Sequence, residues 1–197
     1  YMAISKAKKH SPRKEIILEK AAQLFRKKGF NATSMRDLAE NVGVEAASLY
    51  NHIRSKEEIL QEICFRVANK FMANIDEVNA KDTSALAKVE AILRFNIRQM
   101  IHHYEEVYVS DREWKHLTDP YLSNLKNQRR IYRQRIASII EEGIRNGEIK
   151  KIDAPTAVLI MLHAVSGIES WHRSKQKISG ELLEQNMTLI LVGGLKK

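Results

Sequence analysis

The chain has little of what crosslinks a protein or interrupts helices. Its 197 residues include one cysteine, three prolines and eight glycines. Cys64 has no partner for an internal disulfide, which fits a reducing cytoplasm. Few prolines and glycines leave few turns to reverse strands, whereas the recurring Leu, Ile, Ala, Glu, Lys and Arg suit helices. We therefore expect an all-α fold.

Long hydrophobic runs are also missing. No apolar stretch approaches the roughly 20 residues that cross a bilayer. The opening residues, YMAISKAKKHSPRKE, lack the apolar core of a signal peptide. We expect a cytoplasmic protein that does not contact membranes.

The sequence also lacks the short signatures of catalysis. It has no His-Glu-x-x-His pair, no Gly-x-Ser-x-Gly elbow and no phosphate-cradling glycine loop. His102-His103 with Glu105-Glu106 is the one cluster that suggests a metal, but adjacent residues on a helix point about 100° apart. We expect no enzyme, no cofactor and no metal site.

Positive charge is the first feature that points to a partner. The formal net charge is +9, and the first 60 residues hold 12 Lys and Arg against 7 Asp and Glu. A basic surface attracts nucleic acid, although many basic proteins bind none. Charge therefore leaves the partner open, and we assign the basic arm at residues 2–14 only a salt-sensitive contribution to affinity.

Apolar spacing and capping residues predict a series of helices. Three fall in a small N-terminal head of residues 1–54. A larger bundle, residues 55–197, begins with a helix at 55–78 that head and bundle share. The predicted helices are 13–29, 34–43, 45–52, 55–78, 83–104, a broken one at 105–117, 120–146, 153–174 and 179–195.

The helices at 34–43 and 45–52 are short and meet at Gly43. This arrangement is typical of a helix-turn-helix, in which the second helix enters the major groove of DNA. We expect Ala46 or Ala47 with Leu49 to form an apolar edge that packs on the head. We expect the opposite side of this helix to be exposed to solvent, because it is the side that inserts into the major groove of DNA.

The segment from Arg13 to Leu60 resembles the DNA-binding head of TetR-family transcriptional regulators. The resemblance rests on AAQLFRKKGF, a Thr-Ser cap, RDLAENVGV, SLYNHI and SKEEIL in that order and spacing. Two departures are Ile53, where the family usually has Phe, and Glu45-Ala46-Ala47, where small or basic residues are common. The second departure prevents any transfer of base preference.

The resemblance implies a homodimer that represses transcription from a palindromic operator until a small molecule binds its bundle. By that resemblance, some head residues contact phosphates and others face bases, with hydroxyls, Tyr OH and Lys suited to phosphates. Tyr50 as a packing residue, His52 as an incidental surface histidine and Lys56 as a solvated charge remain alternatives. The implied DNA contacts are Thr33, Ser34, Arg36, Ala46, Ala47, Ser48, Tyr50, Asn51, His52 and Lys56.

The last two predicted helices are the most apolar of the chain, with few charges between residues 154 and 195. A surface helix of a monomer has a narrower apolar stripe, so we expect these helices to pack both inward and against a second subunit. Full burial inside a monomer is the alternative. In TetR-like proteins the corresponding pair forms the dimer interface.

Aromatic, sulfur and polar residues in the bundle suggest a small-molecule site, because such sites are apolar cavities with a few convergent polar groups. Plain core is the alternative for each aromatic, and a hydrogen-bonded histidine is the alternative for His163. The candidate lining residues are Phe71, Phe95, Arg98, His102, Tyr108, Trp114, Tyr132, Met161, His163 and Trp171.

The C-terminal segment GIESWHRSKQKISGELLEQNMTLILVGGL is similar to the ends of TetR-like regulators that sense acyl-CoA thioesters. This similarity implies a long amphipathic anion as effector, whose phosphates would meet arginines. A solvated face is the alternative interpretation of the same arginines, and an effector-independent DNA-binding protein is the alternative function. The arginines in question are Arg98, Arg129, Arg130, Arg133 and Arg135.

Overall fold

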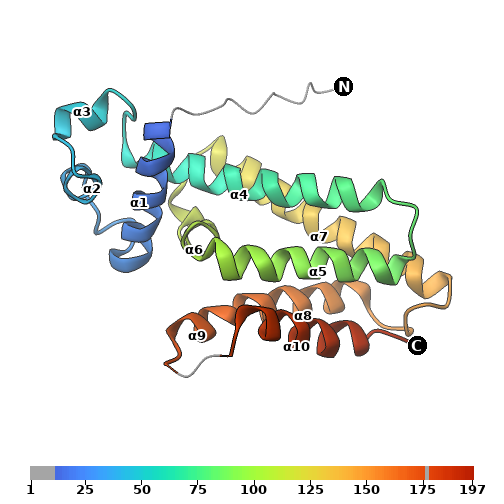
Figure 1. Cartoon of the computed structure of the whole chain (residues 1–197). Coiled ribbons are helices and arrows are strands. Elements are labelled where there is room, and N and C mark those ends of the chain that lie inside the picture. Colours follow the sequence, from blue (N-terminus) through green and yellow to red (C-terminus); the bar gives the residue numbers. More distant parts are fainter. Residues whose placement is uncertain (1–11, 176–177) are drawn as a thin grey trace.

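The computed structural model describes residues 12–175 and 178–197, and within them it confirms the all-helical fold (Figure 1). The described residues form no strand, only an isolated antiparallel bridge between Ile149 and Lys196. Most of the basic arm lies outside the described residues. None of the described helices is long and apolar enough to cross a membrane.

The head consists of α1 (Pro12–Lys28), α2 (Met35–Val42) and α3 (Ala46–Tyr50). Ser34 caps α2 as predicted: its hydroxyl accepts from the N–H of Asp37, whose carboxylate accepts from the N–H of Ser34. Gly43 ends α2 with φ of +78°, a conformation that glycine adopts without strain. The predicted helix-turn-helix is therefore confirmed.

The remaining helices form the bundle. α4 and α7 pack together, α5 lies against both, and α8 and α10 lie at the face of the bundle far from α4 (Figure 1). These helices are α4 (Lys56–Asn79), α5 (Ala85–His102), α6 (Tyr104–Arg112), η1 (Trp114–His116), α7 (Tyr121–Arg145), α8 (Ala154–Ser166), α9 (Ile168–Arg173) and α10 (Gly180–Gly193).

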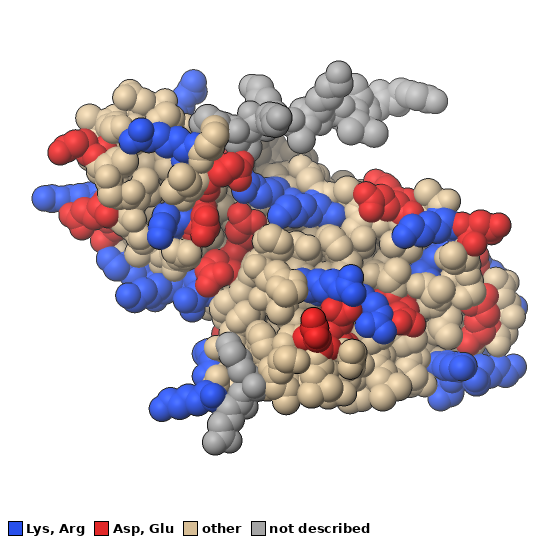
Figure 2. Space-filling model, in the orientation of Figure 1, with Lys and Arg blue, Asp and Glu red and all other residues tan. Residues whose placement is uncertain are grey.

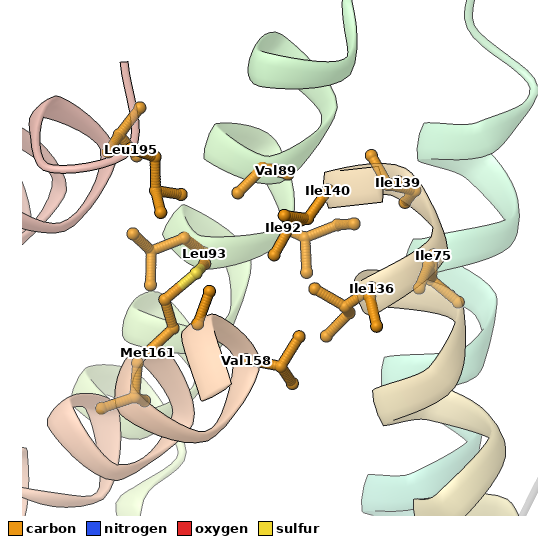
Figure 3. Packing of buried hydrophobic residues seen from close by; sticks show 14 of the residues in the cluster. Ile75, Val89, Ile92, Leu93, Ile136, Ile139, Ile140, Val158, Met161 and Leu195 are labelled. Atoms are coloured by element: carbon orange, nitrogen blue, oxygen red, sulfur yellow. The ribbon is translucent and has the colours of Figure 1, made fainter. Parts of the chain in front are cut away.

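Two hydrophobic cores stabilise the chain. In the bundle core, side chains from α4, α5, α7 and α8 point toward one another (Figure 3). The head core contains residues from α1, α2 and α3 together with Ile59, Ile63 and Cys64 of α4. It also takes in Val109 of α6 and Leu125 of α7. Because α4 contributes residues to both cores, this helix connects the head to the bundle.

The predicted helix at 153–174 is interrupted, which corrects the sequence-based boundary. α8 ends at Ser166 and α9 starts at Ile168, with Gly167 between them. Glycine is a poor helix former, and the Ser166 hydroxyl donates to the Leu162 carbonyl, a side-chain bond that often bends helices. The predicted break in 105–117 is confirmed, since α6 ends at Arg112 before the short η1.

Candidate DNA interface and ligand cavity

α3 is the least buried of the head helices. Leu49 is fully buried and Ile53, just beyond the helix, is 1% exposed, so these two residues anchor the segment. Ala46 and Ala47 are exposed, unlike the apolar edge that we expected. The outward face carries Tyr50, which is 52% exposed. Of the other expected contacts here, Ser48 and His52 are half-buried and Asn51 is exposed.

A shallow hollow of about 440 Å³ lies between the loop before α2, the end of α3 and the start of α4. Four of the expected contact residues line it, namely Thr33, Ser34, Tyr50 and Lys56. Arg54 also lines it and is exposed; sequence reasoning missed this residue, although it is a cation placed between two helices. The hollow therefore brings hydroxyl groups and cations to one place.

Lys56 faces protein carbonyls in this hollow. Its Nζ donates to the carbonyl oxygens of Phe30 at 3.1 Å, Asn31 at 3.3 Å and Thr33 at 3.0 Å. The ammonium also lies 4.6 Å from the centroid of the Phe30 ring. Three donors and three acceptors match, so Lys56 holds the loop of residues 30–33 against the start of α4.

Three other expected contacts differ in how freely they face solvent. Thr33 is 1% exposed, and its hydroxyl donates to the Gly29 carbonyl at 2.8 Å. Ser34 is exposed but is engaged in the cap of α2. Arg36 has a side chain that is 86% exposed and lies 3.7 Å from Glu40 in a surface pair that water can easily open.

The bundle contains a cavity of about 170 Å³ between α4, α5, α6, α7 and α8. Its wall is mostly apolar, with a few polar side chains. Phe71 and Tyr132 are the expected pocket residues that line it. The full lining is Val67, Ala68, Phe71, Met72, Asn96, Met100, Val107, Ser110, Asp111, Gln128, Arg129, Tyr132, Arg133, Leu162, Val165 and Ser166.

Asn96 and Tyr132 form a buried polar pair in this cavity. The Asn96 amide donates to the Tyr132 hydroxyl and to the Ile92 carbonyl, both at 2.7 Å. Burial raises the pKa of Tyr132 well above its ordinary value, so its hydroxyl stays protonated. Nearby, Oε1 of Gln128 is buried and has no hydrogen-bond partner within the described part of the chain. Our aromatic criterion missed both amide residues.

The other expected pocket residues lie outside the cavity lining. Phe95 packs edge-on against Phe71, and Met161 belongs to the bundle core. His102 and His163 are exposed, and Nδ1 of His163 lies 2.8 Å from the Leu159 carbonyl. The remaining ones pack beside the cavity or away from it, and these are Arg98, Tyr108, Trp114 and Trp171.

The five arginines that we considered for phosphate binding have different partners. Arg98 lies 2.8 Å from Glu184 and Arg135 lies 2.7 Å from Asp76. Arg129 is buried and donates to the Ser110 carbonyl. Burial lowers its pKa, an effect that Asp111 opposes. Arg130 donates to two neutral side chains of its own helix, whereas Arg133 has no recorded partner among the described residues.

The loop after α1 is tied directly to the helix that borders the cavity. The N–H of Phe30 donates to Glu113 at 3.3 Å, and the Phe30 ring stacks on His116. Arg66 of α4 bridges Glu15 of α1 at 2.6 Å and Glu106 of α6 at 3.3 Å. A displacement of α6 would therefore also displace the loop after α1 or break the contacts that hold α1.

Apolar side chains are exposed on α8 and α10. Figure 2 shows charged side chains of both signs scattered over the head and a further cluster of both signs on the bundle beside α10, whereas the surface below that cluster is uncharged in this view. Large apolar side chains are exposed there: Leu189 by 73%, Ile190 by 70% and Ile160 by 57%. Exposed apolar side chains of this size are typical of a protein interface.

Two family models match the chain and together cover most of it. A model of bacterial regulatory proteins of the tetR family matches residues 17–63. A model of the tetracyclin repressor-like C-terminal domain matches residues 82–195.

Similar curated proteins include the transcriptional repressor KstR2 of Mycolicibacterium smegmatis. It is 24% identical over 185 residues, which cover 93% of this chain and 90% of that protein. KstR2 of Rhodococcus jostii is 26% identical over 190 residues, covering 94% of this chain and 92% of that protein.

Solved structures share the fold over nearly the whole length. KstR2 of Mycobacterium tuberculosis, described as a ketosteroid transcriptional regulator, superposes with a TM-score of 0.87 at 22% identity and covers 99% of this chain and 97% of its own. AibR in complex with isovaleryl coenzyme A and operator DNA has a TM-score of 0.80 at 24% identity, covering 91% of this chain and 98% of its own.

Proposed function

The chain belongs to the TetR family of bacterial regulatory proteins, and from that membership we propose that it is a transcriptional repressor that binds a palindromic operator as a homodimer. The observation that carries the proposal is α3, whose outer face is exposed beside the hollow at the start of α4. Residues 1–54 then serve as the DNA-binding head and residues 55–197 as the ligand-binding and dimerisation bundle.

In this proposal α3 lies in the major groove. Ala46, Ala47 and Ser48 face bases, where alanine offers only an apolar contact such as one to a thymine methyl. Tyr50 and Arg54 hold phosphates at the hollow, where the N-terminus of α4 adds backbone N–H groups. Arg36, Asn51 and His52 are the further side chains that reach the duplex.

Thr33, Ser34 and Lys56 act at the same interface chiefly as supports. Ser34 fixes the start of α2, whereas Thr33 and Lys56 fix the loop before it. Side chains that contact phosphates must be held in position by their neighbours, because a donor that lies outside hydrogen-bond distance of the phosphate does not contribute to binding.

The partner subunit covers the apolar surface of α8 and α10. Leu189 and Ile190 are too exposed for a stable monomer surface, and their burial by a second copy fits the size and chemistry of permanent interfaces.

The cavity is the proposed effector site, with an acyl-CoA as the ligand class. Its apolar wall and its few polar groups suit such a molecule, and the fold neighbour AibR was solved with isovaleryl coenzyme A. Ser110 and Asp111 of α6 line the cavity two or three residues before Glu113, which binds the head. An effector that displaces α6 and α4 would thus change the spacing of the two heads.

A gel-shift titration with DNA from upstream of the protein's own gene tests this proposal. We expect a dimer to bind that DNA at nanomolar to micromolar protein, and a panel of acyl-CoAs to include one that releases it. Binding without release by any small molecule would favour the effector-independent alternative. Indifference to all double-stranded DNA at low salt would reject the proposal.

A further inference from the structure

The effector cavity borders a second hollow on the surface of the bundle. A groove of about 390 Å³ runs between α7 and α8. Arg133 lines both the cavity and the groove. Arg130 and Arg133 are the charged residues in the groove lining, which includes no carboxylate. The groove therefore carries positive charge, and Arg133, an exposed residue, lies where it borders the mouth of the cavity.

The cavity is small for a ligand site. Drug-sized ligands occupy about 300–1,000 Å³, whereas a cavity of about 150 Å³ holds one benzene. At about 170 Å³ this cavity accommodates about six to eight non-hydrogen atoms. A long acyl chain or a polycyclic body would not fit without a large movement of the helices, but a short acyl group would.

Tyr132 offers the cavity a hydroxyl proton that is not yet used in a hydrogen bond among the described residues. The Tyr132 oxygen accepts from Asn96, and its own proton has no recorded acceptor among the described residues. A buried donor of this kind gains a full hydrogen bond when a ligand supplies an oxygen. A carbonyl oxygen is the acceptor that every acyl thioester carries.

Arg133 differs from the neighbouring arginines because it has no recorded ion pair or hydrogen bond among the described residues. Arg129 is held by Ser110 and Asp111, and Arg135 is held by Asp76. A guanidinium without a carboxylate can bind a phosphate through two parallel hydrogen bonds at no cost in broken ion pairs. Its place at the mouth suits a phosphate that trails behind an enclosed acyl group.

We propose that the cavity and the groove form one bipartite site for a short-chain acyl thioester of a phosphorylated carrier. The acyl group, of about four to six carbons, occupies the cavity with its carbonyl oxygen on the Tyr132 hydroxyl. The carrier leaves past Arg133, which binds a phosphate, and lies in the groove. This inference rests on the proposed function, since it specifies the effector of the same site.

Isothermal titration of the full-length dimer tests it with isovaleryl-CoA, decanoyl-CoA, free isovalerate and free CoA. We expect isovaleryl-CoA to bind at least tenfold more tightly than each of the other three. Arg133→Ala should weaken isovaleryl-CoA binding about tenfold, whereas Arg145→Ala, an exposed arginine at the end of α7, should leave it unchanged. Tyr132→Phe should weaken isovaleryl-CoA about tenfold without changing the affinity for free CoA.

Several results would overturn the inference. One is equal affinity for the five-carbon and ten-carbon thioesters; another is normal isovaleryl-CoA binding by both variants, with folding verified by thermal melts. A protein that binds operator DNA but no acyl thioester also rejects it and leaves the DNA-binding proposal standing. A protein that binds isovaleryl-CoA but no DNA supports the inference and rejects the proposed function.

Discussion

Lys56 illustrates how one side chain can serve an interface without touching the partner. Its ammonium donates to three carbonyl oxygens of the loop at residues 30–33 and lies over the ring of Phe30. The same ring stacks on His116 of η1. The loop thus depends on a cation from α4 and on groups from the bundle. Removing that cation should loosen the support of the hollow before it changes any contact with DNA.

Lys56→Gln should therefore lower the free energy of unfolding by about 1–3 kcal/mol, because three backbone carbonyls, two of them in partly buried contacts, lose a charged donor. Urea denaturation followed by circular dichroism measures this. Lys27→Gln, which changes an exposed lysine of α1, is the matched control and should leave stability unchanged. Unaltered stability of Lys56→Gln together with weaker DNA binding would instead show that Lys56 bonds a phosphate directly.

For Tyr50, in contrast to Lys56, we expect substitution to weaken DNA binding and to leave stability unchanged. Because it is 52% exposed and its proposed partner is a phosphate, Tyr50→Phe should leave stability unchanged. It should weaken binding to operator and to unrelated DNA alike, by about three- to tenfold, the value of one hydrogen bond. Fluorescence anisotropy at fixed salt measures both affinities.

Tyr121→Phe, an exposed tyrosine at the start of α7, is the control for Tyr50. A Tyr50→Phe protein that loses operator binding while keeping its non-specific affinity would contradict a phosphate role and indicate base recognition.

Residues whose roles depend on near neighbours in the chain could be predicted from the sequence. The side chains of Ser34, Ser55 and Asp153 each accept a hydrogen bond from the N–H three residues ahead and so cap a helix, a pattern that adjacent residues determine. The cavity was harder to predict, because Asn96 meets Tyr132 only where α5 packs against α7. A signal for Asn96 existed: it is a polar residue on an otherwise apolar face between Ile92 and Met100.

At the scale of elements, ion pairs as well as apolar contacts attach α10 to the bundle. Glu184 is 9% exposed and accepts from Arg98 at 2.8 Å and from Arg94 at 3.1 Å. The hydrogen bond from Arg98 is the main reason that the pKa of Glu184 is lowered, with Arg94 adding to it against desolvation. This attachment sets the position of the helix that we propose as half of the dimer interface.

Glu184→Gln should cost about 1–2 kcal/mol at pH 7, because the two arginines lose their anionic acceptor and one of them faces an amide NH2 group in place of an oxygen. Since the folded-state pKa lies below the unfolded one, the carboxylate contributes fully above the unfolded value of about 4.3. Its contribution is lost as the pH falls through the folded pKa. Urea midpoints of both proteins should thus differ at pH 7 and converge only as the pH falls below the lowered folded-state pKa; a constant difference would exclude the ion pair as the cause.

Element boundaries could be predicted from the sequence where a strong stop exists and not where packing decides. Gly43 closes α2 as expected. The break at Gly167 was missed, because a lone glycine inside an apolar helical pattern is also compatible with a continuous helix. A Cβ there would lie 3.1 Å from the Ala164 carbonyl, a contact that only the folded chain reveals.

At the scale of the whole molecule, the exposed apolar residues of α8 and α10 predict a dimer. Ile190→Glu should produce a monomer, because a buried unpaired charge costs several kcal/mol in an interface. Sedimentation velocity measures the change, and binding to a palindromic operator should fall by more than a hundredfold as the two heads lose their link. Ile16→Glu, an exposed isoleucine of α1, is the control. A dimeric Ile190→Glu protein would place the interface elsewhere.

Because α4 belongs to both cores, it also determines where the head of this regulator can be joined to another bundle in a chimera. The head's apolar groups close over Ile59, Leu60 and Ile63, which belong to the first half of α4. A chimera that borrows the head should therefore be spliced downstream of Cys64 and should bring matching neighbours for Val109 and Leu125. A junction placed just before Lys56 would transplant three helices without the surface on which they fold.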